Sequence, residues 1–202
     1  MAISSLSTSS MVSGVKRRKI WDQSATTDGF FQIATTTVGA GTAASVTFSS
    51  IPQDYTHLQL RLFTQDTRAT YGITETRISF NGDSSSVYRT HNLFGDGSST
   101  TSNATAELGY IILSEGGYGT TTGGTFGVGV ADILDYANTN KFKTVRHIAG
   151  VDINGTIAGY GGRAGLSSGL WRSTSAISSL TLVSQNANFA QYSKISLYGV
   201  KA

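Results

Sequence analysis

The sequence predicts an all-β protein: an antiparallel two-sheet β-sandwich, jelly-roll-like, that follows an extended N-terminal arm. Short runs of β-branched and aromatic residues recur about every 10 to 15 residues, and Gly, Ser, Asn and Asp separate them. Helix-forming residues are scarce, and charged residues make up only 13% of the chain, about half the usual share. Hydrophobic residues at 39% are sufficient for a core.

The first strands follow a long polar start. Residues 1–30 form the predicted arm, and residues 31–202 form the predicted domain. The run FFQIATTTV (30–38) predicts the first strand, and ASVTFSSIP (44–52) predicts a second that stops at the single proline. The run THLQLRLF (56–63) alternates, which turns its three leucines toward one face of a sheet.

The rest of the chain continues this pattern. TRISFN (76–81) alternates with Ile78 and Phe80 inward, and NGD (81–83) is typical of a tight turn. Asp135 and Asn138 are expected to form a turn where another strand ends. Further strands are predicted at 87–94, 108–113, 125–134, 143–152, 166–172, 177–183 and 192–200, with exposed loops at 95–105, 115–124 and 154–162. Two sheets are expected, because a single sheet would leave one apolar face in water.

Composition excludes several classes of site. The chain has no Cys, which excludes disulfide bonds, thiolate catalysis and cysteine-based zinc sites. No apolar run approaches the roughly 20 residues that cross a bilayer, so no membrane insertion is expected. The start of the chain lacks the early positive charge and apolar segment of a signal peptide.

No catalytic pattern is complete. GLSSG (165–169) matches the nucleophile elbow with Ser167 as nucleophile, but no His follows His147, so the hydrolase order fails. His57, His91 and His147 share no metal-ligand spacing. Nucleotide-binding glycine motifs are absent. The sequence therefore predicts no enzyme, no cofactor and no metal.

The arm contains the basic run of the chain, followed by two apolar residues: Lys16, Arg17, Arg18, Lys19, Ile20 and Trp21. Four interpretations of this run are open: a nuclear targeting signal, a nucleic-acid contact, a solvated tail, or an anchor on a partner protein. The remaining domain carries eleven basic and ten acidic residues, and nucleic-acid binding would need a basic face there as well. Ile20 and Trp21 are unfavourable in water, so these six residues are predicted to anchor the chain on a partner.

Aromatic and polar residues in or beside loops indicate a second candidate surface. Aromatic faces with polar neighbours bind sugar rings, but such residues also build subunit interfaces. The possible glycan contacts are Tyr71, Tyr88, Arg89, His91, Tyr118 and Tyr160.

Five segments in this order carry a resemblance to a known family: SSIPQDYTHLQLRL (49–62), RISFNGDSSSVYRTH (77–91), FGVGVADILDYANTNKFKTVR (126–146), SGLWRSTSAISSLTL (168–182) and SKISLYGVK (193–201). They resemble small β-rich virion structural and tail-fibre-like proteins of tailed bacteriophages, including phages of cyanobacteria and marine bacteria. The resemblance runs from about residue 35 to residue 202. It implies a place in a virus particle and assigns no functional residue.

Together, these observations predict a non-enzymatic virion structural protein on the outer surface of a phage particle. The first alternative is a capsid cement or decoration protein, whose arm binds the major capsid protein. The second is a tail-fibre or baseplate module, anchored on tail proteins, whose loops bind host surface glycans. A homotrimer is expected in either case, because it would bury sheet edges and apolar patches.

Overall fold

The computed structural model describes residues 29–68, 74–116, 124–152, 162–185 and 187–201. Every strand pair in these ranges is antiparallel, and the ranges contain no helix. The prediction of an all-β chain with antiparallel sheets is therefore confirmed.

Most strands belong to one wide sheet. Its eight strands lie in the order β1 (Gly29–Thr37), β14 (Lys194–Lys201), β4 (His57–Thr64), β9 (Gly127–Leu134), β10 (Lys143–Asp152), β11 (Gly162–Trp171), β6 (Tyr88–Gly95) and β7 (Thr100–Leu108).

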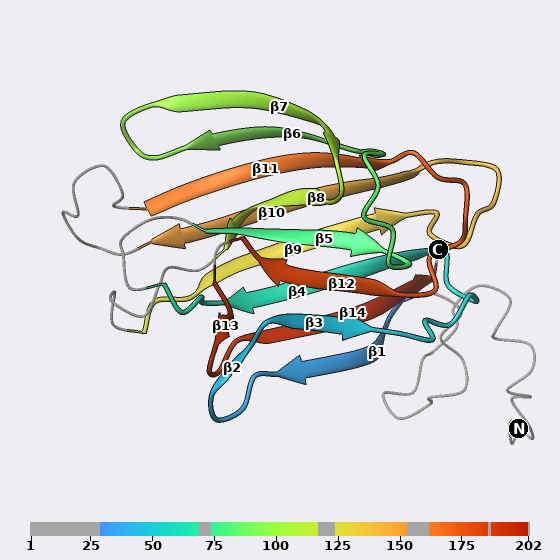
Figure 1. Cartoon of the computed structure of the whole chain (residues 1–202), viewed down its shortest axis with the longest axis horizontal. Coiled ribbons are helices and arrows are strands. Elements are labelled where there is room, and N and C mark those ends of the chain that lie inside the picture. Colours follow the sequence, from blue (N-terminus) through green and yellow to red (C-terminus); the bar gives the residue numbers. More distant parts are fainter. Residues whose placement is uncertain (1–28, 69–73, 117–123, 153–161, 186, 202) are drawn as a thin grey trace, which may run out of the picture.

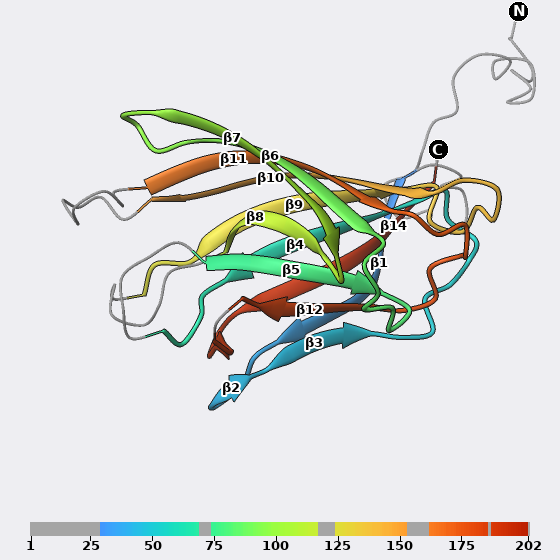
Figure 2. The same cartoon turned by 45° about the horizontal axis from the view of Figure 1, so that its top comes forward.

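A smaller sheet covers one face of the wide sheet. Its four strands lie in the order β3 (Ser45–Phe48), β12 (Leu180–Ser184), β5 (Thr74–Phe80) and β8 (Ile111–Gly116). A short pair joins β2 (Thr42–Ala43) to β13 (Phe189–Ala190). Figures 1 and 2 show the small sheet against the wide sheet, with the edge strand β7 lying beyond its cover. The wide sheet therefore has an inner face toward the small sheet and an outer face away from it.

The core lies between the two sheets. Leu58, Leu60 and Leu62 of β4 all point into it, as the alternation predicts. Ile78 and Phe80 of β5 are fully buried on the facing sheet, which confirms that prediction too. The two alternating patterns are thus the two sides of one hydrophobic core.

Three aromatic side chains fill the end of this core. The ring of Trp171 stacks on Tyr88, with centroids 6.1 Å apart, and lies 5.5 Å from the ring of Phe80. Its indole Nε1 donates a hydrogen bond to Asp83 Oδ2 at 2.8 Å. Hydrogen bonds from Ser85 and Trp171 hold the pKa of the Asp83 carboxyl below its usual range. The predicted turn at 81–83 is confirmed, because Asn81 and Gly82 have φ values of 54° and 70°.

The turn after β9 is also confirmed. Asp135 has a φ of 49°, and its carbonyl accepts a hydrogen bond from the Asn138 amide at 2.9 Å. The buried Lys143 then donates to the carbonyl oxygens of Asn138, Lys141 and Thr174. A charged side chain thus binds this turn to the segment between β11 and β12, which the sequence pattern did not predict.

One predicted loop is wrong. Residues 100–108 form the edge strand β7, where a loop at 95–105 is expected. Both faces of β7 are mostly exposed, because this strand lies beyond the cover of the small sheet. A strand with both faces exposed does not need alternating apolar and polar residues. The Thr, Ser and Asn residues of β7 therefore have the composition of a loop. The predicted loop at 154–162 lies outside the described residues except for Gly162, which begins β11.

Gly169 marks a close approach between the two sheets. A Cβ at this position would lie 2.3 Å from Ile111 Cγ2 of β8. We expect Gly169→Ala to lower the free energy of unfolding by about 1–3 kcal/mol, as overpacking does. Urea denaturation followed by circular dichroism measures this loss. Within an Ile111→Ala background, the same change should have almost no further effect, because the clashing side chain is gone.

Gly150 provides the matched control for Gly169. It lies on the neighbouring strand β10, and a Cβ there would meet its nearest atom, the Arg163 carbonyl oxygen, at 3.6 Å. Gly150→Ala should therefore change stability by less than about 0.5 kcal/mol. Equal losses for the two glycine variants would contradict the close approach.

Candidate functional site

A row of exposed aliphatic side chains crosses the outer face of the wide sheet. Leu93, Leu166, Ile148 and Val130 are direct register partners on β6, β11, β10 and β9. Their exposed fractions are 48%, 44%, 61% and 41%. Directly paired residues of antiparallel strands share a face, so the four side chains form one continuous line.

A second row runs beside the first. Val128 of β9 pairs with Phe63 of β4, and both are exposed. The ring of Phe126 stacks on Phe63 with centroids 4.5 Å apart. We call Leu93, Leu166, Ile148, Val130, Val128 and Phe63 the apolar patch.

Small residues leave hollows beside the patch. Gly150 pairs with Val128 and with Ala164 on its two sides. One hollow lies over Gly150, Val128 and Ala164, and another lies between Val128, Val130 and Ile148. The surface thus alternates projecting aliphatic side chains with shallow depressions, which suits packing against another protein surface.

Polar side chains border the patch on β4, β9 and β10. Arg146 Nη2 donates to Asp132 Oδ2 at 2.7 Å, and Gln59 Nε2 donates to Asp132 Oδ1 at 2.9 Å. Arg61 Nε donates to Gln59 Oε1 at 3.2 Å, and its guanidinium lies 4.7 Å from the centre of the Tyr198 ring. Burial opposes ionisation of Asp132, but the hydrogen bonds from Arg146 and Gln59 outweigh it and lower its pKa. This border therefore pairs Asp132 with Arg146, while Arg61 is held by the Gln59 amide and the Tyr198 ring.

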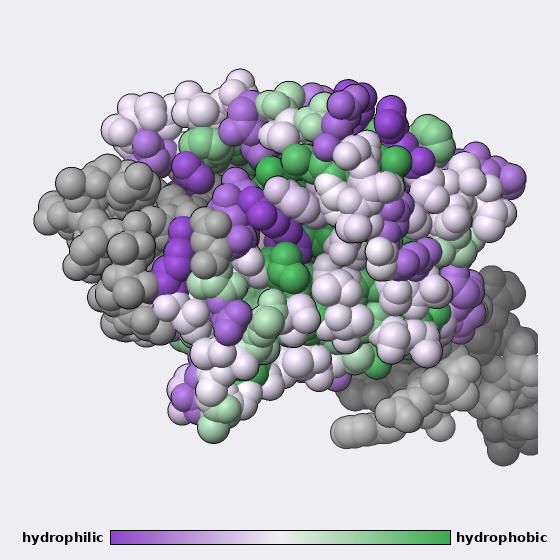
Figure 3. All heavy atoms as spheres, in the orientation of Figure 1, coloured by the Kyte–Doolittle hydropathy of each residue, from purple (hydrophilic) through white to green (hydrophobic). Residues whose placement is uncertain are grey.

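The outer face of the small sheet differs in character. Its strands present Ser45, Thr47, Thr181, Arg77 and Ser79 outward. The hydroxyl groups of Thr47 and Thr181 lie 3.0 Å apart and share a hydrogen bond. Figure 3 shows this side of the molecule, where pale and purple residues predominate over the small sheet. The apolar patch is thus a property of one outer face and not of both.

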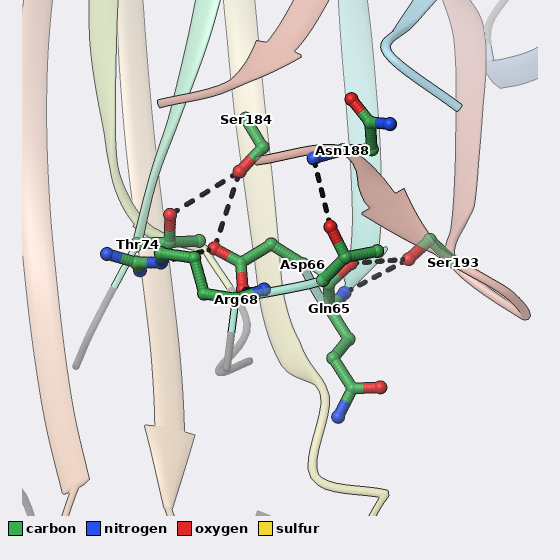
Figure 4. A network of polar contacts seen from close by, with 8 residues as sticks. Gln65, Asp66, Arg68, Thr74, Ser184, Asn188 and Ser193 are labelled. Carbon is green, nitrogen blue, oxygen red and sulfur yellow. Dashed lines mark hydrogen bonds and ion pairs between the residues drawn. The ribbon is translucent and has the colours of Figure 1, made fainter. Parts of the chain in front are cut away.

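A buried ion pair lies where β4 ends. Asp66 is 1% exposed, and Arg68 donates to its carboxylate from Nε at 2.8 Å and from the backbone amide at 3.1 Å. Ser184 of β12 donates to the same carboxylate at 3.5 Å, and Thr74 of β5 lies 3.4 Å from the Ser184 hydroxyl (Figure 4). These contacts connect three segments that are distant in the sequence.

The neighbouring residues extend this network to β13. The Ser193 hydroxyl accepts a hydrogen bond from the Gln65 amide and donates one to the Gln65 carbonyl oxygen, each at 3.0 Å. The Asn188 amide donates to the Thr67 hydroxyl at 3.3 Å (Figure 4). Because these hydrogen bonds join β4, β5 and the segments on either side of β13, we interpret the network as structural support for the fold, although the buried Arg68 Nη2 has no hydrogen-bond partner among the described residues.

The elbow-like segment GLSSG lies within the extended strand β11. Ser167 is 1% exposed and pairs with His147 of β10, which is 2% exposed. Both side chains lie in the core, on the inner face of the wide sheet. An elbow needs a sharp turn that exposes its nucleophile, so the structure gives this segment the opposite geometry. Burial lowers the pKa of His147 to about 4.

The structure separates the predicted glycan contacts. Tyr88 lies fully inside the core, where its hydroxyl lies 3.0 Å from the Phe80 amide and from the Asp83 carbonyl oxygen. Its ring is therefore closed to any ligand, which corrects its assignment as a glycan contact. Arg89 and His91 are exposed on the outer face of β6.

The remaining predicted site residues lie outside the described part of the chain. They are Tyr71, Tyr118 and Tyr160, and the arm residues Lys16, Arg17, Arg18, Lys19, Ile20 and Trp21. The sequence did not reveal the apolar patch. A signal was present in FGVGVADIL (126–134), where apolar residues occupy both faces of one predicted strand.

Among the described residues, no group of three His, Asp or Glu side chains is placed to hold a metal ion. The same part of the chain offers no helix that could span a membrane. A comparison with protein families finds no match, and neither a curated protein nor a solved structure matches the chain significantly.

Proposed function

We propose that this chain is a non-enzymatic structural protein of a bacteriophage virion, displayed on the particle surface and held there by its N-terminal arm. The observation that carries the proposal is the apolar patch within its polar border. Such a surface has the composition of a protein contact, an apolar centre inside a polar rim. The resemblance of five sequence segments to virion proteins supports a virus particle as the location of the chain.

The proposal includes a jelly-roll sandwich as the fold. Strand order supports it: β1, β14, β4 and β9 are consecutive in the wide sheet, and β3, β12, β5 and β8 make up the small sheet. If these eight strands are lettered A to H in chain order, the four in the wide sheet lie in the order A, H, C, F and the four in the small sheet in the order B, G, D, E. This is the strand order of a jelly roll, which is built from two Greek keys. Two hairpins, β6–β7 and β10–β11, are then insertions that widen one sheet from four strands to eight.

Within the particle, we favour a cement or decoration protein bound to the major capsid protein. The arm precedes β1, which is an edge strand of the wide sheet. The basic and apolar residues at 16–21 include four positive charges and a Trp, a combination that suits contact with an acidic partner surface.

Removal of residues 1–24 tests the anchor. The core residues among the described part of the chain begin at Ile33 and Val38, so we expect the shortened chain to fold with unchanged circular dichroism and to lose its binding to the particle. Co-sedimentation of the purified chain with particles that lack it measures the binding. Retained binding by the shortened chain would show that residues 1–24 are not the anchor.

Copy number per virion distinguishes the two locations. Quantitative mass spectrometry against the major capsid protein should give a simple ratio if the chain decorates the capsid lattice. A number typical of one tail assembly would instead support the tail-fibre or baseplate module, for which the exposed Arg89 and His91 remain candidate glycan contacts. Absence from the particle would refute both locations.

A further inference from the structure

We infer that the apolar patch on the outer face of the wide sheet binds a second copy of this chain, so that two wide sheets pack face to face. This inference uses the same patch as the virion proposal, but it is tested separately, because it concerns the purified chain in solution.

The continuity of the patch is the first argument. Single exposed hydrophobic residues are common on soluble proteins, but contiguous ones mark interaction surfaces. Here four strands each contribute one aliphatic side chain at paired register positions, and Ile148 at the centre of the row is 61% exposed. The outer face of the small sheet, with Thr47, Thr181 and Ser79, shows that this chain can build a polar outer face.

The size of the face is the second argument. Eight strands spaced about 4.8 Å apart, each about eight residues long at about 3.3 Å per residue, span about 34 Å by about 26 Å. This area of about 900 Å² is close to the roughly 800 Å² that each partner contributes to a standard stable interface. The patch occupies five of the eight strands, so a face-to-face pair reaches the area of a stable dimer when the polar border of the patch also takes part in the contact.

The charge distribution indicates a second copy as the partner. The six residues of the patch are all uncharged, so the patch does not select a partner by charge. The bordering Asp132 is already paired with Arg146 of its own chain. Two identical faces can therefore approach each other with no charge among the six patch residues, while Arg61, the register partner of Val130, lies at the border against the Tyr198 ring.

Shape agrees with two-fold symmetry. In such an interface, each surface must complement itself. The patch offers both projections, at Ile148 and Leu166, and hollows, over Gly150 and Ala164. A two-fold axis that crosses the strands between the row of Ile148 and Leu166 and the row of Gly150 and Ala164 would set the projections of one copy against the hollows of the other, at the spacing of about 10 Å that packed sheets adopt.

Sedimentation velocity of the full chain tests the inference. We expect a dimer whose dissociation constant rises about a hundredfold or more in Ile148→Lys, because the new ammonium group would be buried without a partner. Thr181→Lys adds the same charge on the outer face of the small sheet and should leave the dimer unchanged. Circular dichroism and urea unfolding establish that both variants fold.

The absence of Cys in the chain permits a second test. Ile148→Cys should give a covalent dimer with a short bis-maleimide reagent, whereas Thr181→Cys should remain monomeric under the same treatment. A monomer at all concentrations, a trimer, or an oligomer that Ile148→Lys leaves intact would overturn the inference. The trimer would instead agree with the oligomer expected from the sequence.

Discussion

Replacement of Trp171 with alanine should lower the free energy of unfolding by about 3–5 kcal/mol, the range measured for removal of a large aromatic side chain from a core. Trp171 is 2% exposed and packs against Tyr88 and Phe80. Its loss would leave a cavity between the two sheets and would remove the indole donor from Asp83. Urea denaturation followed by circular dichroism measures the effect.

Two further variants make this result specific. Trp171→Phe keeps an aromatic ring but removes the indole hydrogen bond, so we expect a smaller loss than for alanine. Phe142→Ala removes an aromatic side chain that is 51% exposed, and this change should cost less than about 1 kcal/mol. Similar losses for Trp171→Ala and Phe142→Ala would contradict the position of Trp171 in the core.

Acid should destabilise the protein through His147. This side chain is 2% exposed, and its Nδ1 has no hydrogen-bond partner among the described residues. Burial lowers its pKa from 6.5 to about 4 in the folded state. Between these two values the unfolded chain binds a proton that the folded chain does not. The free energy of unfolding should therefore fall as the pH drops from 6.5 to 4, by about 3 kcal/mol in total.

Urea unfolding across this pH range measures the effect. His147→Gln should remove the added slope, while His91→Gln, at an exposed position of β6, should retain it. Asp83 and Asp132 have lowered pKa values, so in their ionised form they stabilise the folded chain. This contribution is lost only below their usual pKa of 3.8, outside the range in which His147 acts. An NMR titration that places the pKa of His147 near 6.5 would refute this account.

The sequence predicts the strands whose two faces differ in environment. Leu58, Leu60 and Leu62 alternate with polar residues because β4 has one buried face, and β5 behaves in the same way. Strand β7 escapes prediction because neither face is covered, so nothing in its side chains has to alternate. The alternation of apolar and polar residues thus indicates that one face of a strand is buried, and it is missing from a strand with two exposed faces.

The apolar patch and the ion pair at Asp66 could not be predicted for a different reason. The Asp66–Arg68 pair itself is local, but its contacts with Ser184 and Thr74, like the patch, combine segments that meet only when the strands assemble into sheets. Leu93 and Ile148, for example, lie in one row because β11 lies between their strands with Leu166 aligned to both. Tyr88 was misassigned because its neighbours in the sequence are polar, whereas its hydroxyl group is satisfied inside the fold.

The pairing of β1 with β14 also determines how this domain can be engineered. Gly29 is the register partner of Lys201, so the two ends of the described fold lie side by side at one edge of the wide sheet. A peptide fused after residue 202 would therefore emerge next to the point where the arm joins β1. For outward display, insertion of the peptide into the β6–β7 turn, which leaves the arm in place, is the better design.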